Sequence, residues 1–188
     1  MRRVLLFGLA LVAVLVAVRF SLPTVDARAQ PGWLESTVAT HVRSWLTPSK
    51  YDTMPNPVSC DASALAAARA HWADHCATCH ANNGNGQTML GRGMYPKPPD
   101  MRATGTQSQS DGRIYATIRN GVPLTGMPAF GQPTDGDKET WALVCFVRHL
   151  PSMTPDEELA MRAMNPKTDA DREEERQEAE FLNGGSVP

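Results

Sequence analysis

The sequence contains few aromatic residues and no internal repeat. Phe, Trp and Tyr together make up 6% of its 188 residues. No segment recurs at a period of roughly 20 to 50 residues, which argues against a solenoid or a propeller. Proline and glycine, with 15 and 14 residues, are frequent by comparison. We therefore expect one folded domain with a modest core, prominent loops and extensions outside the domain.

The chain also lacks an excess of basic residues beyond its N-terminus. Its formal net charge is -2, and because the first 29 residues carry +3, the remainder carries -5. Proteins that bind nucleic acid need a basic surface to neutralise phosphates. We therefore expect no nucleic-acid partner.

A hydrophobic run of full membrane-spanning length is missing. Fifteen residues without a charged or strongly polar side chain, Val4 to Val18, lie between Met-Arg-Arg and Arg19, whereas about 20 are needed to span hydrocarbon. Residues 1–29 are interpreted as an export signal of one of two kinds. One is a signal peptide cleaved after Ala29, which would release a soluble periplasmic protein. The other, which we favour, is a retained transmembrane anchor with its basic N-terminus in the cytoplasm.

Residues 30–59 are expected to form an amphipathic segment and a linker. Apolar or amphipathic residues recur there at spacings of three and four, which predicts a short helix. They are Trp33, Leu34, Val38, His41, Val42, Trp45 and Leu46. We expect this face to pack on the domain; the alternative is that the two tryptophans lie at a membrane interface. Prolines at positions 48, 55 and 57 then end helical structure.

Residues 60–151 are expected to form the folded domain. Three helices are expected: from Asp61 or Ser63 to His75, from Ser110 to Asn120, and an apolar core helix over residues 136–150. The Gly- and Pro-rich stretch over residues 81–109 predicts a long ordered loop.

Residues 152–188 are expected to form a C-terminal extension. The pattern Thr154-Pro155-Asp156-Glu157 is typical of a capping box that begins another helix. The acidic tail beyond it is predicted to be disordered or a frayed, solvated helix.

The residues Cys76-Ala77-Thr78-Cys79-His80 match the C-x-x-C-H signature of covalent haem attachment. Two thiols three positions apart at a helix end can each form a thioether with a haem vinyl group, while the adjacent imidazole of His80 binds the iron. A zinc site would need two more Cys or His ligands, and a thioredoxin-type pair would need a preceding strand. Neither context is present, so we expect one covalently bound haem c with its iron.

A low-spin haem needs a second axial ligand, for which we favour Met127. A methionine thioether is a soft, neutral donor that favours ferrous iron, and Pro128 and nearby glycines can aim this side chain. The alternative is that Met127 is a core methionine. Several other residues are rival ligands, and we expect them to have packing, surface or capping roles instead. They are Met89, Met94, Met101, His41, His71, His75 and His149.

On these motifs, and on the closing helix from Trp141 to Leu150, residues 60–151 resemble the class I cytochrome c family. The resemblance implies a small all-α fold of about four to five helices around one haem, with axial ligands at His80 and Met127. It also implies that the first and last helices cross, with Ala68 and Trp72 against Trp141 and Phe146. A carbonyl near Pro96 or Pro98 would hold the free nitrogen of His80.

Two cysteines, Cys60 and Cys145, remain outside the motif. An oxidising compartment favours a disulfide between them. Cys145, however, lies within an apolar helix, where a buried free thiol is ordinary. We favour the free thiols at this stage, and the disulfide remains the alternative.

With both axial positions filled, we expect a one-electron Fe(II)/Fe(III) carrier and no enzyme activity or small-molecule substrate. The expected partners are a membrane-bound donor and acceptor in a periplasmic respiratory chain, with the N-terminal helix as a membrane tether. A cytochrome subunit of a larger membrane-bound oxidoreductase or oxidase is the alternative. A haem sensor or peroxidase is a third possibility, but nothing resembling a distal acid–base pair accompanies the motif.

Overall fold

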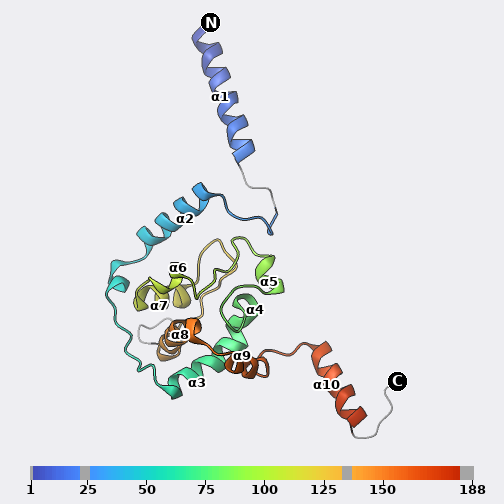
Figure 1. The fold of residues 1–188 in the computed structure, drawn as a ribbon. Helices are drawn as coiled ribbons and strands as arrows, with labels where there is room; N and C mark the ends of the chain where they lie inside the picture. The colour runs from blue at the N-terminus through green and yellow to red at the C-terminus, as the bar shows by residue number, and fades with distance from the viewer. Residues whose placement is uncertain (1, 22–25, 133–136, 183–188) are drawn as a thin grey trace.

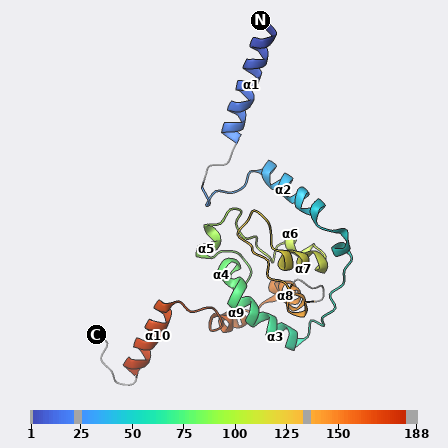
Figure 2. The ribbon, with the colours of Figure 1, turned by 180° about the vertical axis from the view of Figure 1, so that it is seen from behind.

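The computed structural model describes residues 2–21, 26–132 and 137–182, and over these residues the chain is helical without a strand. The predicted all-α fold is confirmed. In Figures 1 and 2, the segments from α3 to α9 gather into one body, from which α1 and α10 extend in different directions. The elements are α1 (Arg2–Ser21), α2 (Trp33–Leu46), η1 (Ser49–Asp52), α3 (Ala62–His71), η2 (Trp72–Cys76), α4 (Ala77–His80), α5 (Met89–Arg92), α6 (Thr104–Gln107), α7 (Asp111–Asn120), α8 (Lys138–His149), η3 (Leu150–Ser152), α9 (Pro155–Arg162) and α10 (Asp169–Leu182).

The three core helices begin at side chains that accept hydrogen bonds from the first helical turn. Asp61 caps α3, Ser110 caps α7 and Asp137 caps α8. Such caps satisfy backbone N–H groups that have no partner within the helix. α7 ends at Gly121, where φ is +66°, a backbone conformation that glycine adopts at low cost. The predicted helix from Ser110 to Asn120 is therefore present, with its N-cap at Ser110.

The core lies where α3 and α8 pack against each other. Trp72, which follows α3 directly, lies against Phe146 of α8 with ring centroids 5.4 Å apart. Ala68 is buried on the same side of α3. On the other side of α8, Trp141 stacks on Tyr115 of α7 at 4.0 Å. Of the expected crossing, the contact of Trp72 with Phe146 is present, whereas Trp141 stacks on Tyr115 of α7.

A disulfide joins the segment before α3 to the middle of α8. Cys60 and Cys145 are bonded, with their Cα atoms 5.3 Å apart. Asn56 lies beside the bond and donates from Nδ2 to the Trp141 carbonyl oxygen at 3.1 Å. The expectation that Cys145 is a buried free thiol was therefore wrong. Burial of Cys145 does not prevent pairing, because the chain before α3 crosses directly over α8.

The long loop between α4 and α7 is ordered because it wraps on the end of α8. The Arg148 guanidinium donates to the Gln107 carbonyl oxygen at 2.7 Å and to the Asp111 carboxylate at 2.8 Å. Gln107 in turn donates from Nε2 to the carbonyl oxygens of Met101 and Val147. Two short helices, α5 and α6, interrupt the loop, where the sequence analysis predicted only irregular structure.

Over residues 152–182, the described part of the C-terminal extension, the chain forms the helices α9 and α10. The capping box predicted at Thr154 is present and begins α9. Glu157 in this box pairs with Arg69 of α3 at 2.6 Å and with His149 at 3.1 Å, which fastens α9 to the body. Of the two alternatives for the acidic tail, residues 169–182 adopt the solvated helix, α10, with no buried side chain.

The N-terminal part of the chain forms two helices that bury no side chain among those described. In α1 the large apolar side chains from Val4 to Val18 are 47–77% exposed. Within the ranges that the structure covers, no helix meets the combined length and hydropathy expected of a membrane span. The amphipathic helix predicted after it is present as α2, and its large apolar side chains are also exposed. The expected packing of this apolar face on the domain was wrong.

Gly112 lets the start of α7 pack directly on the segment around Tyr51. A Cβ atom at position 112 would meet the Tyr51 carbonyl oxygen and, at 2.9 Å, Met54 Cβ. We expect Gly112→Ala to lower the free energy of unfolding by about 1–3 kcal/mol, the usual cost of overpacking, as measured by denaturant titration. Gly105→Ala in α6 is the control, since nothing lies within 4 Å of a Cβ there. Equal stability of the two variants would contradict the prediction.

Candidate functional site

The predicted attachment motif lies at the end of one bent helical segment. α3 continues through the π-helical turn η2 into α4, and π-helical turns are often associated with functional sites. Cys76 ends η2, and Cys79 and His80 lie in α4. Ala81 then leaves the helix at φ +62°, and its carbonyl oxygen accepts a hydrogen bond from Trp72 Nε1 at 3.0 Å. All three side chains of the motif are therefore held at one helix end.

Both motif cysteines are free thiols in this structure. Cys76 is buried and Cys79 is half-buried, whereas the other two cysteines are bonded to each other. Burial, together with the nearby Cys79, raises the pKa of Cys76 to about 12. Burial also raises the pKa of Cys79. Neither sulfur is held in a disulfide, so both remain available for thioether formation.

His80 presents a neutral imidazole. Its side chain is buried, and its ring lies 5.8 Å from the Trp72 ring, centroid to centroid. Burial lowers the pKa of His80 to about 4, and the neutral ring is the form that binds metals. Its Nδ1 atom is buried and has no hydrogen-bond partner within the described part of the chain. The bond expected from a carbonyl near Pro96 or Pro98 is therefore not made.

Met127 lies in a tight turn that folds back on α7. The Val122 N–H donates to the Met127 carbonyl oxygen at 3.0 Å, and the Met127 N–H donates to Thr125 Oγ1 at 3.2 Å. Beyond the turn, the Phe130 N–H donates to the Ile118 carbonyl oxygen at 3.1 Å. The backbone at Met127 is held on both sides, and its side chain is half-buried.

The loop around α5 contacts both the attachment motif and the Met127 turn. Thr88, which caps α5, donates from Oγ1 to the Cys79 carbonyl oxygen at 3.3 Å. Met94 follows α5, and its terminal methyl group lies against Gly126, the residue before Met127. The sequence analysis named Met94 only as a rival ligand and missed this contact. No local signal could have revealed it, because the two loops are separated by α6 and α7.

Comparison with known proteins identifies the central part of the chain. Residues 63–147 match the family model described as cytochrome C oxidase, cbb3-type, subunit III. These residues form a cytochrome c domain. No curated protein matches the chain. The domain implies covalently bound haem c with its iron and a role in electron transfer, so the predicted family and cofactor are confirmed.

The residues of the cytochrome c domain fit a haem. Two free thiols and a neutral imidazole share one helix end, and His80 Nδ1 is an unsatisfied buried polar atom. The hydroxyl group of Tyr115 is a second buried polar atom without a partner among the described residues. Cys76, Cys79 and His80 are the residues that would hold the group. Met127 stays a predicted ligand.

The surroundings of Cys76 and Cys79 fit neither a zinc site nor a thioredoxin-type redox pair. Among the residues with described positions, no group of three or more His, Cys, Asp or Glu side chains could hold a metal ion. A zinc site at Cys76 and Cys79 would need such a group. A thioredoxin-type pair would follow a strand, whereas Cys76 follows a helix.

Most rival ligands of the cytochrome c domain have other contacts in the structure. Met89 is 87% exposed, and Met101 is buried in the hydrophobic core. His149 pairs with Glu157. His41 bonds within α2, and His71 and His75 lie against each other with ring centroids 4.8 Å apart. Met94 is a rival whose side chain lies against Gly126 in the Met127 turn.

Proposed function

We propose that this chain is a single-haem electron carrier of a periplasmic respiratory chain, tethered to the outer side of a bacterial cytoplasmic membrane. The observation that carries the proposal is the end of α4, where two free thiols and a buried neutral imidazole lie together within the cytochrome c domain. Haem c bound there supplies one-electron exchange between Fe(II) and Fe(III).

The proposed roles of the residues follow from their donor atoms. Cys76 and Cys79 would attach the haem through thioethers, and His80 and Met127 would supply a nitrogen and a sulfur ligand to its iron. When both axial positions are filled, no position is left for a substrate or a gas. The chain therefore acts as a carrier, and its partners are a membrane-bound donor and acceptor that dock near the haem edge.

The tether is proposed for α1. Its described apolar side chains are exposed, and the segment begins with two arginines, a charge pattern that keeps such an end in the cytoplasm. We expect the intact mass of the native protein to include residues 1–29. A mass that begins at Gln30 would instead indicate a soluble periplasmic carrier.

An optical spectrum of the dithionite-reduced protein, before and after carbon monoxide, tests the carrier function. We expect a sharp c-type, low-spin spectrum that the gas does not change, because Met127 occupies the sixth position. A prompt shift on adding carbon monoxide would contradict the proposal and would favour a sensor or a peroxidase.

Replacing Met127 tests its assignment as the second axial ligand. We expect Met127→Ala to lose the far-red charge-transfer band of methionine-bound ferric haem and to bind carbon monoxide when reduced. Met89→Ala is the matched control, since that side chain points into solvent, and it should keep the band. If Met127→Ala kept the band and Met94→Ala lost it, Met94 would be the ligand.

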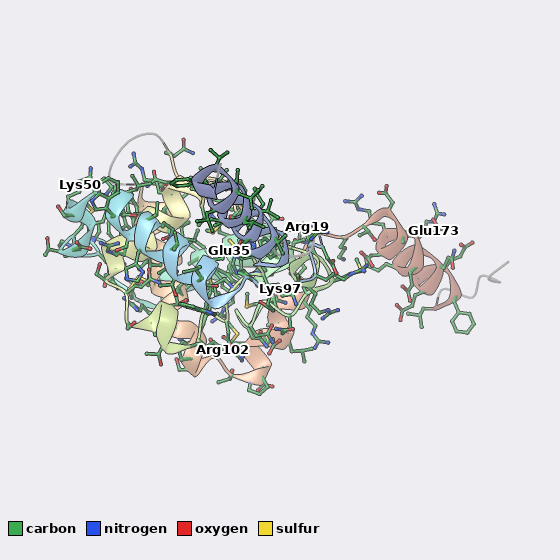
Figure 3. All side chains as sticks on the ribbon, turned by 90° about the horizontal axis from the view of Figure 1, so that it is seen from above. Arg19, Glu35, Lys50, Lys97, Arg102 and Glu173 are labelled. Carbon is green, nitrogen blue, oxygen red and sulfur yellow. A yellow bond between two sulfur atoms is a disulfide. The ribbon has the colours of Figure 1, made fainter. Side chains whose placement is uncertain are left out.

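A second candidate function is a cytochrome subunit of a larger membrane-bound complex. The matched family model is described as an oxidase subunit. The helix α10, which carries Glu173, also extends from the body (Figure 3). Co-purification of a stoichiometric integral-membrane protein in mild detergent would support this function. Recovery of the chain alone would favour the free carrier.

A further inference from the structure

The helix α2 turns its polar side, and not its apolar side, toward the cytochrome c domain. Thr40, Ser44 and Thr47 recur at spacings of four and three, so they share one helix face. Together with Arg43 they line one wall of a cleft of about 370 Å³ whose other wall comes from α6, α7 and the loop between them. Arg113 of α7 donates to Ser44 Oγ across this cleft at 3.2 Å.

The opposite face of α2 is apolar and faces away from the domain. Leu34, Val38, Val42 and Trp45 recur at spacings of four, four and three, about half a turn away from the polar face. Together with Trp33 and Leu46 they are 46–83% exposed. Helices that pack on a soluble core bury their apolar face. The cytochrome c domain is therefore not the surface that covers this face.

The position of α2 in the chain indicates what covers it. The helix follows α1 after a short connection, and α2 lies between α1 and the body in both side views (Figures 1 and 2). Seen from above, α1 and α2 both lie over the domain, with Glu35 of α2 above it and Arg19 near the end of α1 (Figure 3). The helix α2 thus lies on the side of the body from which α1 extends.

We propose that the apolar face of α2, formed by Leu34, Val38, Val42, Trp45 and Leu46, lies on the lipid surface of the membrane. Amphipathic helices bury such a face about 5–10 Å into the boundary between headgroups and acyl chains, and tryptophan is enriched at that depth. This inference rests on the proposed membrane tether and deepens it. The contacts of Ser44 with Arg113 and of Glu35 with Tyr95 then orient the domain relative to the membrane.

Tryptophan fluorescence of the full-length, haem-loaded protein in phosphatidylethanolamine–phosphatidylglycerol vesicles tests the proposal. Trp33→Phe leaves Trp45 as the exposed tryptophan, because Trp72 and Trp141 are buried in the domain core, and haem quenches fluorescence at close range. We expect lipids brominated near the headgroup to remove most of the Trp45 emission. Lipids brominated at the bilayer centre should remove little.

Charge substitutions on and outside the apolar face of α2 provide the matched comparison. In the Trp33→Phe background, Val38→Glu with Val42→Glu should abolish the quenching. Ser36→Glu with Thr37→Glu adds the same two charges outside both the apolar face and the cleft, and should preserve it. Equal effects of the two pairs would overturn the proposal.

Vesicle flotation and the haem spectrum distinguish a failure of the α2 proposal from a failure of the proposed function. Protein that floats with a normal spectrum but shows no quenching of Trp45 would overturn the α2 proposal alone. Protein that does not float would overturn both the tether and the α2 proposal. If Trp45 were shielded from acrylamide but not quenched by brominated lipid, a protein surface would cover α2, and the proposal would be wrong.

Discussion

Replacing Cys60 and Cys145 with serine is expected to lower the free energy of unfolding by about 2–5 kcal/mol. The disulfide joins residues 85 positions apart, and in the chain-entropy account a cross-link that closes a long loop restricts the unfolded chain most. The bond also holds the segment before α3 against α8, where Asn56 hydrogen bonds to Trp141. Guanidinium titration of the haem-loaded protein, followed by far-UV circular dichroism, measures the loss.

The control for this prediction is the same titration in the presence of a reductant. Wild-type protein and the Cys60→Ser, Cys145→Ser variant should then have similar midpoints, because neither contains the bond. Thioethers at Cys76 and Cys79 are not cleaved by the reductant, so the haem remains attached in both. Equal stability of the two proteins without reductant would show that the disulfide contributes little.

Replacing Gly121 with alanine is expected to displace the Met127 turn and to remove the methionine ligand. Gly121 adopts φ +66°, which costs a non-glycine residue about 1–2 kcal/mol. A Cβ atom there would also lie 2.7 Å from the Met127 carbonyl oxygen and 2.6 Å from the carbonyl carbon of Pro128. Because both are backbone atoms held by the turn, the turn itself must move. We expect loss of the far-red charge-transfer band and new carbon monoxide binding.

Gly126→Ala is the matched control in the same turn. A Cβ atom at position 126 would meet only the side chain of Met94, whose terminal methyl group can rotate away. This variant should therefore keep the band. If Gly121→Ala also kept the band, then either Met127 is not the ligand or the turn tolerates the displacement. The Met127→Ala spectrum distinguishes these two explanations.

The helices of the domain were predicted well because their signals are local. The caps at Asp61 and Ser110 and the box at Thr154 act within three residues of the chain. The apolar residues of α8 recur at the spacing that places them on one face of a helix, so this helix could be predicted from its own residues. The predicted crossing of Trp72 with Phe146 came from the family resemblance, and the structure contains it.

The predictions that failed concern partners distant in the sequence. Cys145 was expected to be a free thiol because an apolar helix can bury one, but nothing in that helix reveals that Cys60 crosses over it. In the same way, the amphipathic pattern of α2 predicted an apolar face but could not reveal which surface that face contacts. The structure shows that the polar face of α2 lies toward α7.

The sequence by itself determined the attachment motif and the capped starts of α3, α7 and α9, because each depends on side chains within a few positions of one another. It missed α5, α6 and the continuation of the first helix to His80. Only the tertiary structure decided three other features: the pairing of Cys60 with Cys145, the outward direction of the apolar face of α2, and the contact of Met94 with Gly126. These depend on how segments far apart in the chain pack together. Such packing is set by the whole core, and short sequence patterns do not encode it.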